Sequence, residues 1–240
     1  MSTMNALCLI CRSPDKIWCD LLNQFENYDV YVVIDSEICD IDPFITEYKN
    51  ITFVSIGCEL CVSGGYTNMN YLMKKCVTGW EKAIYFFTVV NCSHQYVWFI
   101  EDDVFFMSEN TVSMIDNKYS NADLLSNRIT ENPSGEKKTW HWNKINILYD
   151  PPYCKGMMCA VRMSKCMLNC IKNYAVTNGT LFFLEALFPT IAMKNNLTHN
   201  FPPEMSTIRY DRNYNKSDIY STHMYHPVKN ILNHIKFREP

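Results

Sequence analysis

The chain has 240 residues, of which 48% are hydrophobic and 20% are charged, and its formal net charge is -3. The apolar fraction is large enough to bury a core, which excludes intrinsic disorder, and a content of only 7 glycines excludes a collagen-like chain. The slight acidic excess argues against a general nucleic-acid-binding protein, which normally carries a basic surface. We therefore expect one globular domain over residues 1–240 and no nucleic-acid partner.

The N-terminal residues show no targeting signal. No apolar stretch approaches the roughly 18 residues that a membrane-spanning helix requires. Met1–Asn5 lacks the basic residues of a signal peptide, and the apolar run Ala6–Ile10 is too short for its central region. These observations predict a cytoplasmic protein without a transmembrane segment.

The first half of the chain alternates apolar runs with amphipathic segments. A helix is expected to open at Ser13, which can cap it, and a second one covers Tyr71–Phe87. The predicted strands are Ala6–Cys11, Tyr28–Ile34, Ile51–Ile56 and Tyr96–Ile100. This alternation predicts an α/β fold with a mostly parallel central sheet flanked by helices.

The second half is more irregular. Ser120–Pro152 is polar, and the segment after Asn200 is rich in Tyr, Asn, Asp and Arg. Between them the pattern predicts a strand and two helices, at Met157–Val161, Lys165–Tyr174 and Leu181–Asn195.

The 12 cysteines allow two interpretations. Cys8-x-x-Cys11 and Cys58-x-x-Cys61 have a spacing that occurs in zinc sites. However, Cys8 lies inside a predicted buried strand, and nothing indicates an oxidising compartment, so buried free thiols are the preferred interpretation.

The strongest functional signal is Glu101-Asp102-Asp103, which directly follows a predicted buried strand. In open α/β sheets ligands bind beyond the carboxyl ends of the strands. Clustered carboxylates suit Mg²⁺ or Mn²⁺ that bridges a phosphate, although solvated acids in a turn are the alternative.

Two further positions carry possible chemistry. Glu185 lies on a strongly apolar predicted helix, where loss of solvation raises a carboxyl pKa and suits a general base, unless the residue is at the surface or paired with an arginine. His226 could complete a metal shell and Lys229 could neutralise phosphate, or both could belong to a surface turn.

Four weaker candidates have equally ordinary alternatives. Asp35, at a strand end, could hold a ribose hydroxyl or simply cap a turn, and Lys82 could reach phosphate or remain solvated. Trp140 and Trp142 could stack on a sugar ring or fix a long loop to the core.

In this order, these features resemble the nucleotide-sugar-dependent glycosyltransferases of the GT-A fold, over roughly Ala6 to Lys229. The resemblance is best at Glu101-Asp102-Asp103, which looks like the DXD metal motif of the family, and at His226-Pro227-Val228-Lys229. It implies a donor-binding half at residues 1–106 and an acceptor-binding and catalytic half at residues 107–240.

The resemblance also implies individual roles. Asp103 and His226 would bind Mn²⁺ or Mg²⁺, and Glu185 would be the base of an inverting transfer from a nucleoside-diphosphate sugar to a hydroxyl of a glycan or glycoprotein acceptor. Trp140 and Trp142 would contact the acceptor. The implied donor-binding residues are Asp35, Lys82, Glu101, Asp102, Gly156 and Lys229.

The chain departs from the family in one place, since Glu185 is followed by Ala186 rather than by a second acid. A sugar-phosphate nucleotidyltransferase and a non-catalytic nucleotide-sugar-binding or glycan-binding protein remain as alternatives. The first usually has a glycine-rich segment after its first strand, whereas this chain has Cys11-Arg12-Ser13-Pro14 there.

Overall fold

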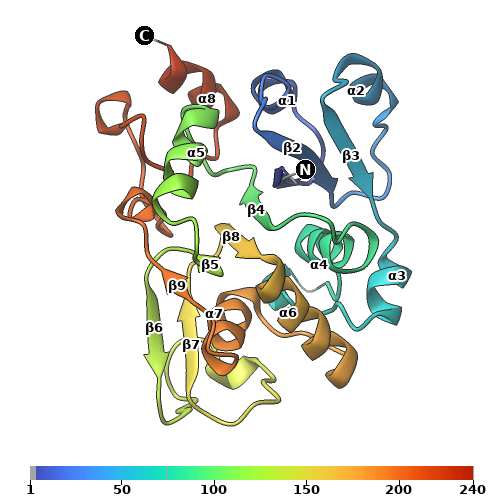
Figure 1. Cartoon of the computed structure of the whole chain (residues 1–240), viewed down its shortest axis with the longest axis vertical. Helices are drawn as coiled ribbons and strands as arrows, with labels where there is room; N and C mark the ends of the chain where they lie inside the picture. The colour runs from blue at the N-terminus through green and yellow to red at the C-terminus, as the bar shows by residue number, and fades with distance from the viewer. Residues whose placement is uncertain (1–3, 74, 240) are drawn as a thin grey trace.

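The apolar runs of the first half form the strands of a central sheet (Figure 1). The structure is a computed structural model, and it describes residues 4–73 and 75–239. The main sheet has seven strands in the order β3-β2-β1-β4-β8-β5-β9. Their bounds are β1 Asn5–Cys11, β2 Tyr28–Ile34, β3 Ile51–Ser55, β4 Tyr96–Glu101, β5 Leu124–Leu125, β8 Ala160–Ser164 and β9 His199–Asn200.

The main sheet is mostly parallel, and it crosses the boundary between the two halves of the chain. Strand β1 pairs in parallel with β2 and β4, β2 with β3, and β5 with β9. Only β8 is antiparallel to its neighbours β4 and β5. Strands β6 (Ile129–Asn132) and β7 (Tyr153–Gly156) form a separate antiparallel pair. The predicted α/β class is therefore confirmed.

Helices cover both faces of the sheet because the central strands are apolar on both sides. In β1, Ala6, Cys8 and Ile10 face the core layer of α4, α6 and α7, whereas Leu7 and Leu9 face the layer of α1 and α5. The helices are α1 Lys16–Leu22, α2 Asp42–Glu47, α3 Cys58–Ser63, α4 Gly79–Tyr85, α5 Glu109–Lys118, α6 Lys165–Asn178, α7 Leu184–Lys194 and α8 Ile231–Arg238. Among the described residues, none of these helices has the length and apolarity that crossing a membrane requires.

Three predicted boundaries were wrong. Helix α1 is capped by Asp15, whose Oδ1 accepts from the Ile17 amide at 2.8 Å, rather than by Ser13. The predicted strand Met157–Val161 begins only at Ala160, where pairing with β4 starts. Helix α7 begins at Leu184 rather than at Leu181.

The predicted helix Tyr71–Phe87 was wrong over its first half. Tyr71–Met73 form a single 3₁₀ turn, Lys74 lies outside the described residues, and α4 starts at Gly79. The buried Glu81 side chain explains this start, because it accepts hydrogen bonds from the Thr78 and Met69 amides. That carboxylate holds the segment before α4 in a loop, which borders a cavity of about 1090 Å³.

None of the 12 cysteines forms a disulfide bond, which agrees with the expectation that no disulfide framework is present. Burial was predicted too broadly, because Cys76, Cys92 and Cys166 are exposed. Cys8 and Cys11 lie on opposite faces of β1, which is why their spacing does not bring the two thiols together.

Candidate functional site

A cavity of about 1090 Å³ opens at the carboxyl ends of β1, β2 and β4. Strands β2 and β3 continue the sheet on one side of β1, and β4 adjoins it on the other, so this edge is a topological switch point. The lining includes Asp35 after β2 and Glu101, Asp102 and Asp103 at the end of β4. The structure thus brings four of the predicted residues to one cavity.

Glu101 is fixed by the indole of Trp80, whose Nε1 donates to Oε1 at 2.6 Å. Burial and the nearby charge of Asp103 raise the pKa of Glu101 to about 7. Asp102, which lines the same cavity, has its pKa raised to about 6 by loss of solvation and by the charge of Asp103. The raised pKa values mean that these neighbouring carboxyls do not ionise together readily. A bound cation would favour their charged forms.

Asp103 and His226 face each other although they are 123 positions apart in the sequence. Nε2 of His226 lies 3.3 Å from Oδ1 of Asp103, a buried oxygen without a hydrogen-bond partner among the described residues. Nδ1 of His226 lies 2.7 Å from the carbonyl oxygen of Arg209, so it carries a proton, and Nε2 faces the carboxylate. Burial opposes protonation of His226, but the Asp103 carboxylate prevails and raises the pKa of this imidazole.

The backbone of the acidic turn is held from both ends of the chain. The Trp18 indole on α1 donates to the carbonyl of Asp102 at 2.9 Å, and the Val228 amide donates to that of Asp103 at 2.7 Å. Beyond the turn, the Arg238 guanidinium on α8 donates to the carbonyl of Phe106 at 2.9 Å. Trp18 and Val228 thereby clamp the turn, and helices α1 and α8 contact each other beside it (Figure 1).

A second cavity, of about 420 Å³, contains Glu185. Glu185 lies in the first turn of α7, and its Oε2 accepts from the Tyr210 hydroxyl at 2.5 Å. Burial raises the pKa of Glu185, although the bond from Tyr210 acts in the opposite direction. Trp140 and Gly156 line the same cavity. A Cβ at position 156 would meet Met158 Cε at 2.9 Å and Ile129 Cγ2 at 3.0 Å, so the glycine avoids crowding in this strand pair.

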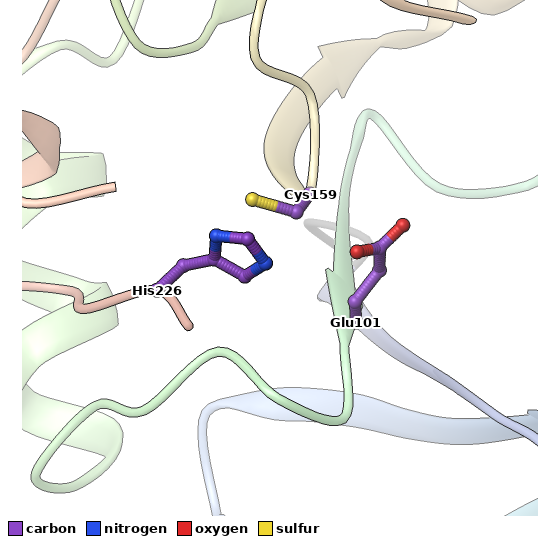
Figure 2. Close-up of side chains that lie close together, drawn as sticks. All are labelled: Glu101, Cys159 and His226. Carbon is purple, nitrogen blue, oxygen red and sulfur yellow. The ribbon is translucent and has the colours of Figure 1, made fainter. Parts of the chain in front are cut away.

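Cys159 lies between the two groups of acids. Its thiol is buried, and burial together with the charges of Glu101, Asp103 and Glu185 raises its pKa well above the usual value. The thiol, a carboxylate oxygen of Glu101 and a ring nitrogen of His226 all lie within 4.8 Å of one another. Figure 2 shows the imidazole pointing into the space between Cys159 and Glu101.

Three predicted site residues lie elsewhere. Lys82 is 1% exposed, and its Nζ donates to the carbonyl of Asp35 at 2.7 Å, so it supports the cavity wall from behind. Trp142 is buried beside Tyr153, where it fixes the loop to the core rather than offering a surface to a sugar ring. Lys229 lines a third cavity together with Tyr214 and Phe237.

Sequence reasoning missed Arg12, Cys159 and Tyr210. Arg12 lines the large cavity and directly follows β1, so a basic residue at a strand end was an available signal. Cys159 and Tyr210 carried no such signal, because only the folded chain places them beside Glu101 and Glu185.

No known protein family matches the chain, and no curated protein matches it. Solved structures do resemble it. The 4-diphosphocytidyl-2C-methyl-D-erythritol synthase of Anaerococcus prevotii has a TM-score of 0.49 at 9% identity, covering 83% of this chain and 86% of that one. The mannosyltransferase Ktr4p of S. cerevisiae has a TM-score of 0.44 at 14% identity, covering 83% and 68%.

Mouse xyloside xylosyltransferase 1 has a TM-score of 0.46 at 10% identity, covering 95% of this chain and 99% of that one. All three TM-scores lie below 0.5. These likenesses therefore carry no argument about the activity or the substrates of this chain.

Proposed function

We propose that the chain is a metal-dependent glycosyltransferase that moves a sugar from a nucleoside-diphosphate sugar to an acceptor hydroxyl. The observation that carries this proposal is the pair formed by Asp103 and His226. A buried carboxylate oxygen that has no hydrogen-bond partner in the described part of the chain lies 3.3 Å from an imidazole nitrogen, beside a cavity large enough for a nucleotide.

The donor set fits a divalent cation of the Mn²⁺ or Mg²⁺ type. Asp103 Oδ1 and His226 Nε2 would hold it, and the Arg209 carbonyl fixes the tautomer that leaves Nε2 directed toward Asp103. Such a cation, when bound, neutralises the charge that develops on a departing diphosphate.

The large cavity would receive the nucleotide. Asp35 and Arg12 both line this cavity, where Asp35 would accept from ribose hydroxyls and Arg12 would donate to the diphosphate. Glu101 and Asp102 would contact the ribose, the donor sugar or water on the cation. The clamp formed by Trp18 and Val228 keeps the backbone of the acidic turn in place during binding.

The smaller cavity would receive the acceptor. Glu185 would take the proton of the acceptor hydroxyl as that oxygen attacks the anomeric carbon from the face opposite the diphosphate. The product then has inverted configuration. Trp140 offers an aromatic face to an acceptor sugar, and Lys155 Nζ lies 5.0 Å from the centre of its ring, on the same cavity wall.

A thermal-shift panel tests donor binding first. Uridine-, guanosine- and thymidine-diphosphate sugars are each added with and without Mn²⁺ to the native chain and to Asp103→Asn. A ligand at about 100 times its Kd stabilises a protein by roughly 2.7 kcal/mol, which is readily measured as a rise in Tm. We expect one nucleotide class to give a Mn²⁺-dependent rise that Asp103→Asn abolishes.

The panel also separates the proposal from its alternatives. No rise with any nucleotide sugar, in a protein that melts cooperatively, contradicts the proposal. A rise with nucleoside triphosphates, followed by pyrophosphate release from a triphosphate and a sugar phosphate, would instead identify a nucleotidyltransferase.

Transfer is tested with the donor class found in the panel. Glu185→Gln should keep the donor-induced rise in Tm and lose transfer, because it removes the base and leaves the large cavity intact. Full activity of Glu185→Gln would show that the base is wrong. NMR of the product establishes whether the anomeric configuration is inverted.

A further inference from the structure

Three side chains with different ligand chemistries converge beside the acidic turn. Glu101 comes from the end of β4, Cys159 from the residue before β8, and His226 from the segment before α8. One ligand atom of each lies within 4.8 Å of the other two (Figure 2). Among the described residues this is the one group of three potential metal ligands at such spacing.

We propose that Glu101, Cys159 and His226 form a second cation site, which binds a thiolate-preferring dication such as Zn²⁺. Zinc binds a thiolate, an imidazole nitrogen and a carboxylate oxygen at about 2.3, 2.0 and 2.0 Å, which in a tetrahedral shell separates neighbouring ligand atoms by roughly 3.3–3.5 Å. The three ligand atoms, which lie within 4.8 Å of one another, would have to draw together to this range when the ion binds.

The thiol determines which ion the site prefers. Sulfur ligands select Zn²⁺ and similar ions, whereas Mg²⁺ and Mn²⁺ favour oxygen. A bound dication also displaces the proton of a coordinating thiol. The alternative use of Cys159 as a nucleophile lacks a base, because both ring nitrogens of His226 already face the oxygens of Arg209 and Asp103.

The two cation sites exclude each other. Both use Nε2 of His226, since Nδ1 donates to the carbonyl of Arg209. One lone pair binds one cation, so Zn²⁺ at the thiolate site removes a ligand from the site at Asp103. The consequence that Zn²⁺ inhibits sugar transfer rests on the proposed function, but cation binding itself does not.

Cobalt titration of the whole chain tests the site directly. Co²⁺ replaces Zn²⁺ in tetrahedral sites and gives a thiolate-to-cobalt charge-transfer band in the near ultraviolet when a cysteine is a ligand. The titration uses the native chain, Cys159→Ala and the matched control Cys61→Ala, which alters another buried thiol. Zn²⁺ affinity is measured in parallel by competition with a chromophoric chelator.

We expect one Co²⁺ per chain with a charge-transfer band that persists in Cys61→Ala and disappears in Cys159→Ala. The Zn²⁺ affinity of Cys159→Ala should fall by about tenfold or more. Excess Mn²⁺ should suppress the band of the native chain because of the shared imidazole.

Two results would overturn the inference. The first is the absence of the charge-transfer band in the native chain, a result that does not depend on whether Cys159→Ala folds. Loss of the band in Cys61→Ala with retention in Cys159→Ala would assign the thiolate to the Cys58–Cys61 pair instead. Because none of these readings uses a nucleotide sugar, failure of the cation site and failure of the proposed transfer are separate outcomes.

Discussion

The hydroxyl of Tyr210 donates a 2.5 Å hydrogen bond to the Glu185 carboxylate, and it joins the segment after β9 to the first turn of α7. Burial raises the pKa of Glu185, while this hydrogen bond stabilises the charged form and partly offsets the effect of burial. The pKa of the candidate base is therefore set by two opposing influences, of which one can be removed by a single substitution.

Tyr210→Phe should move the pH dependence of transfer to higher pH. Without the donated hydrogen bond, the carboxylate of Glu185 is less stable and its pKa rises further, so the basic form appears only at higher pH. The measurement is kcat/KM against pH for the native chain, Tyr210→Phe and the control Tyr214→Phe. An unchanged ascending limb in Tyr210→Phe would show that Glu185 is not the titrating base.

Arg12→Gln should weaken binding of the donor nucleotide. A hydrogen bond to a charged group contributes about 1.5–3 kcal/mol, which corresponds to roughly a 10- to 100-fold increase in Kd. Isothermal titration calorimetry with the nucleoside diphosphate measures this change in Kd. The control is Arg212→Gln, since Arg212 lines the third cavity. Equal affinities of both variants and the native chain would place the diphosphate away from the end of β1.

The buried pair of Asp116 and Arg162 should dominate the stability of the central sheet. Arg162 is 1% exposed and lies 2.7 Å from Asp116, which also accepts from the indole of Trp98. Removing one member leaves an uncompensated buried charge, so Asp116→Asn or Arg162→Met should each lower the free energy of unfolding by about 3–5 kcal/mol. Urea denaturation measures this loss.

The double variant is the control for that pair. If the two charges stabilise each other, the double variant that carries both Asp116→Asn and Arg162→Met should lose less unfolding free energy than the sum of the two single losses. Additive losses would mean that packing, rather than the ion pair, accounts for the effect.

His234 should make the fold sensitive to mild acid. It is fully buried, its Nε2 donates to the carbonyl of Val228 at 2.9 Å, and its Nδ1 has no partner among the described residues. Burial lowers its pKa from 6.5 to about 4. The unfolded chain therefore binds the proton first, so stability is complete above about pH 6.5 and is lost as the pH falls toward about 4.

His234→Phe should flatten this dependence. The native chain should lose up to about 1.4 kcal/mol of unfolding free energy per pH unit through this residue alone. Denaturation at several pH values, compared with the partly exposed His223→Phe, measures the slope. A slope in His234→Phe equal to that of the native chain would assign the acid sensitivity to other groups.

The strands of the first half were predictable because each is a short apolar run with polar residues at its ends. Strands β2 and β3 begin where the pattern placed them, and Asp35 and the acidic triplet lie at the strand ends as expected. The predicted ends of helices and strands were wrong where a single tertiary contact determines the local structure. The buried Glu81 carboxylate that delays α4 until Gly79 cannot be distinguished in the sequence from an ordinary helical glutamate.

The candidate site was predictable only where a pattern is local. Glu101-Asp102-Asp103 is contiguous, so the sequence identified it, and Asp35 followed from its strand end. Lys82 was misplaced because its amine turns back toward a carbonyl behind the cavity wall. Cys159 and Tyr210 were missed because their neighbours are 58 and 25 positions away in sequence, a separation that no local pattern encodes.

The clamp on the acidic turn also determines when the turn can form. Trp18 and Asp102 are 84 positions apart, and Phe106 and Arg238 are 132 positions apart. Contacts between such distant residues form late during folding, because closing a long loop costs chain entropy before the new contact stabilises the protein. The turn therefore becomes rigid only after both distant segments have docked. Partly folded chains should therefore lack the preorganised form of the proposed cation site, so that cation affinity should report complete folding.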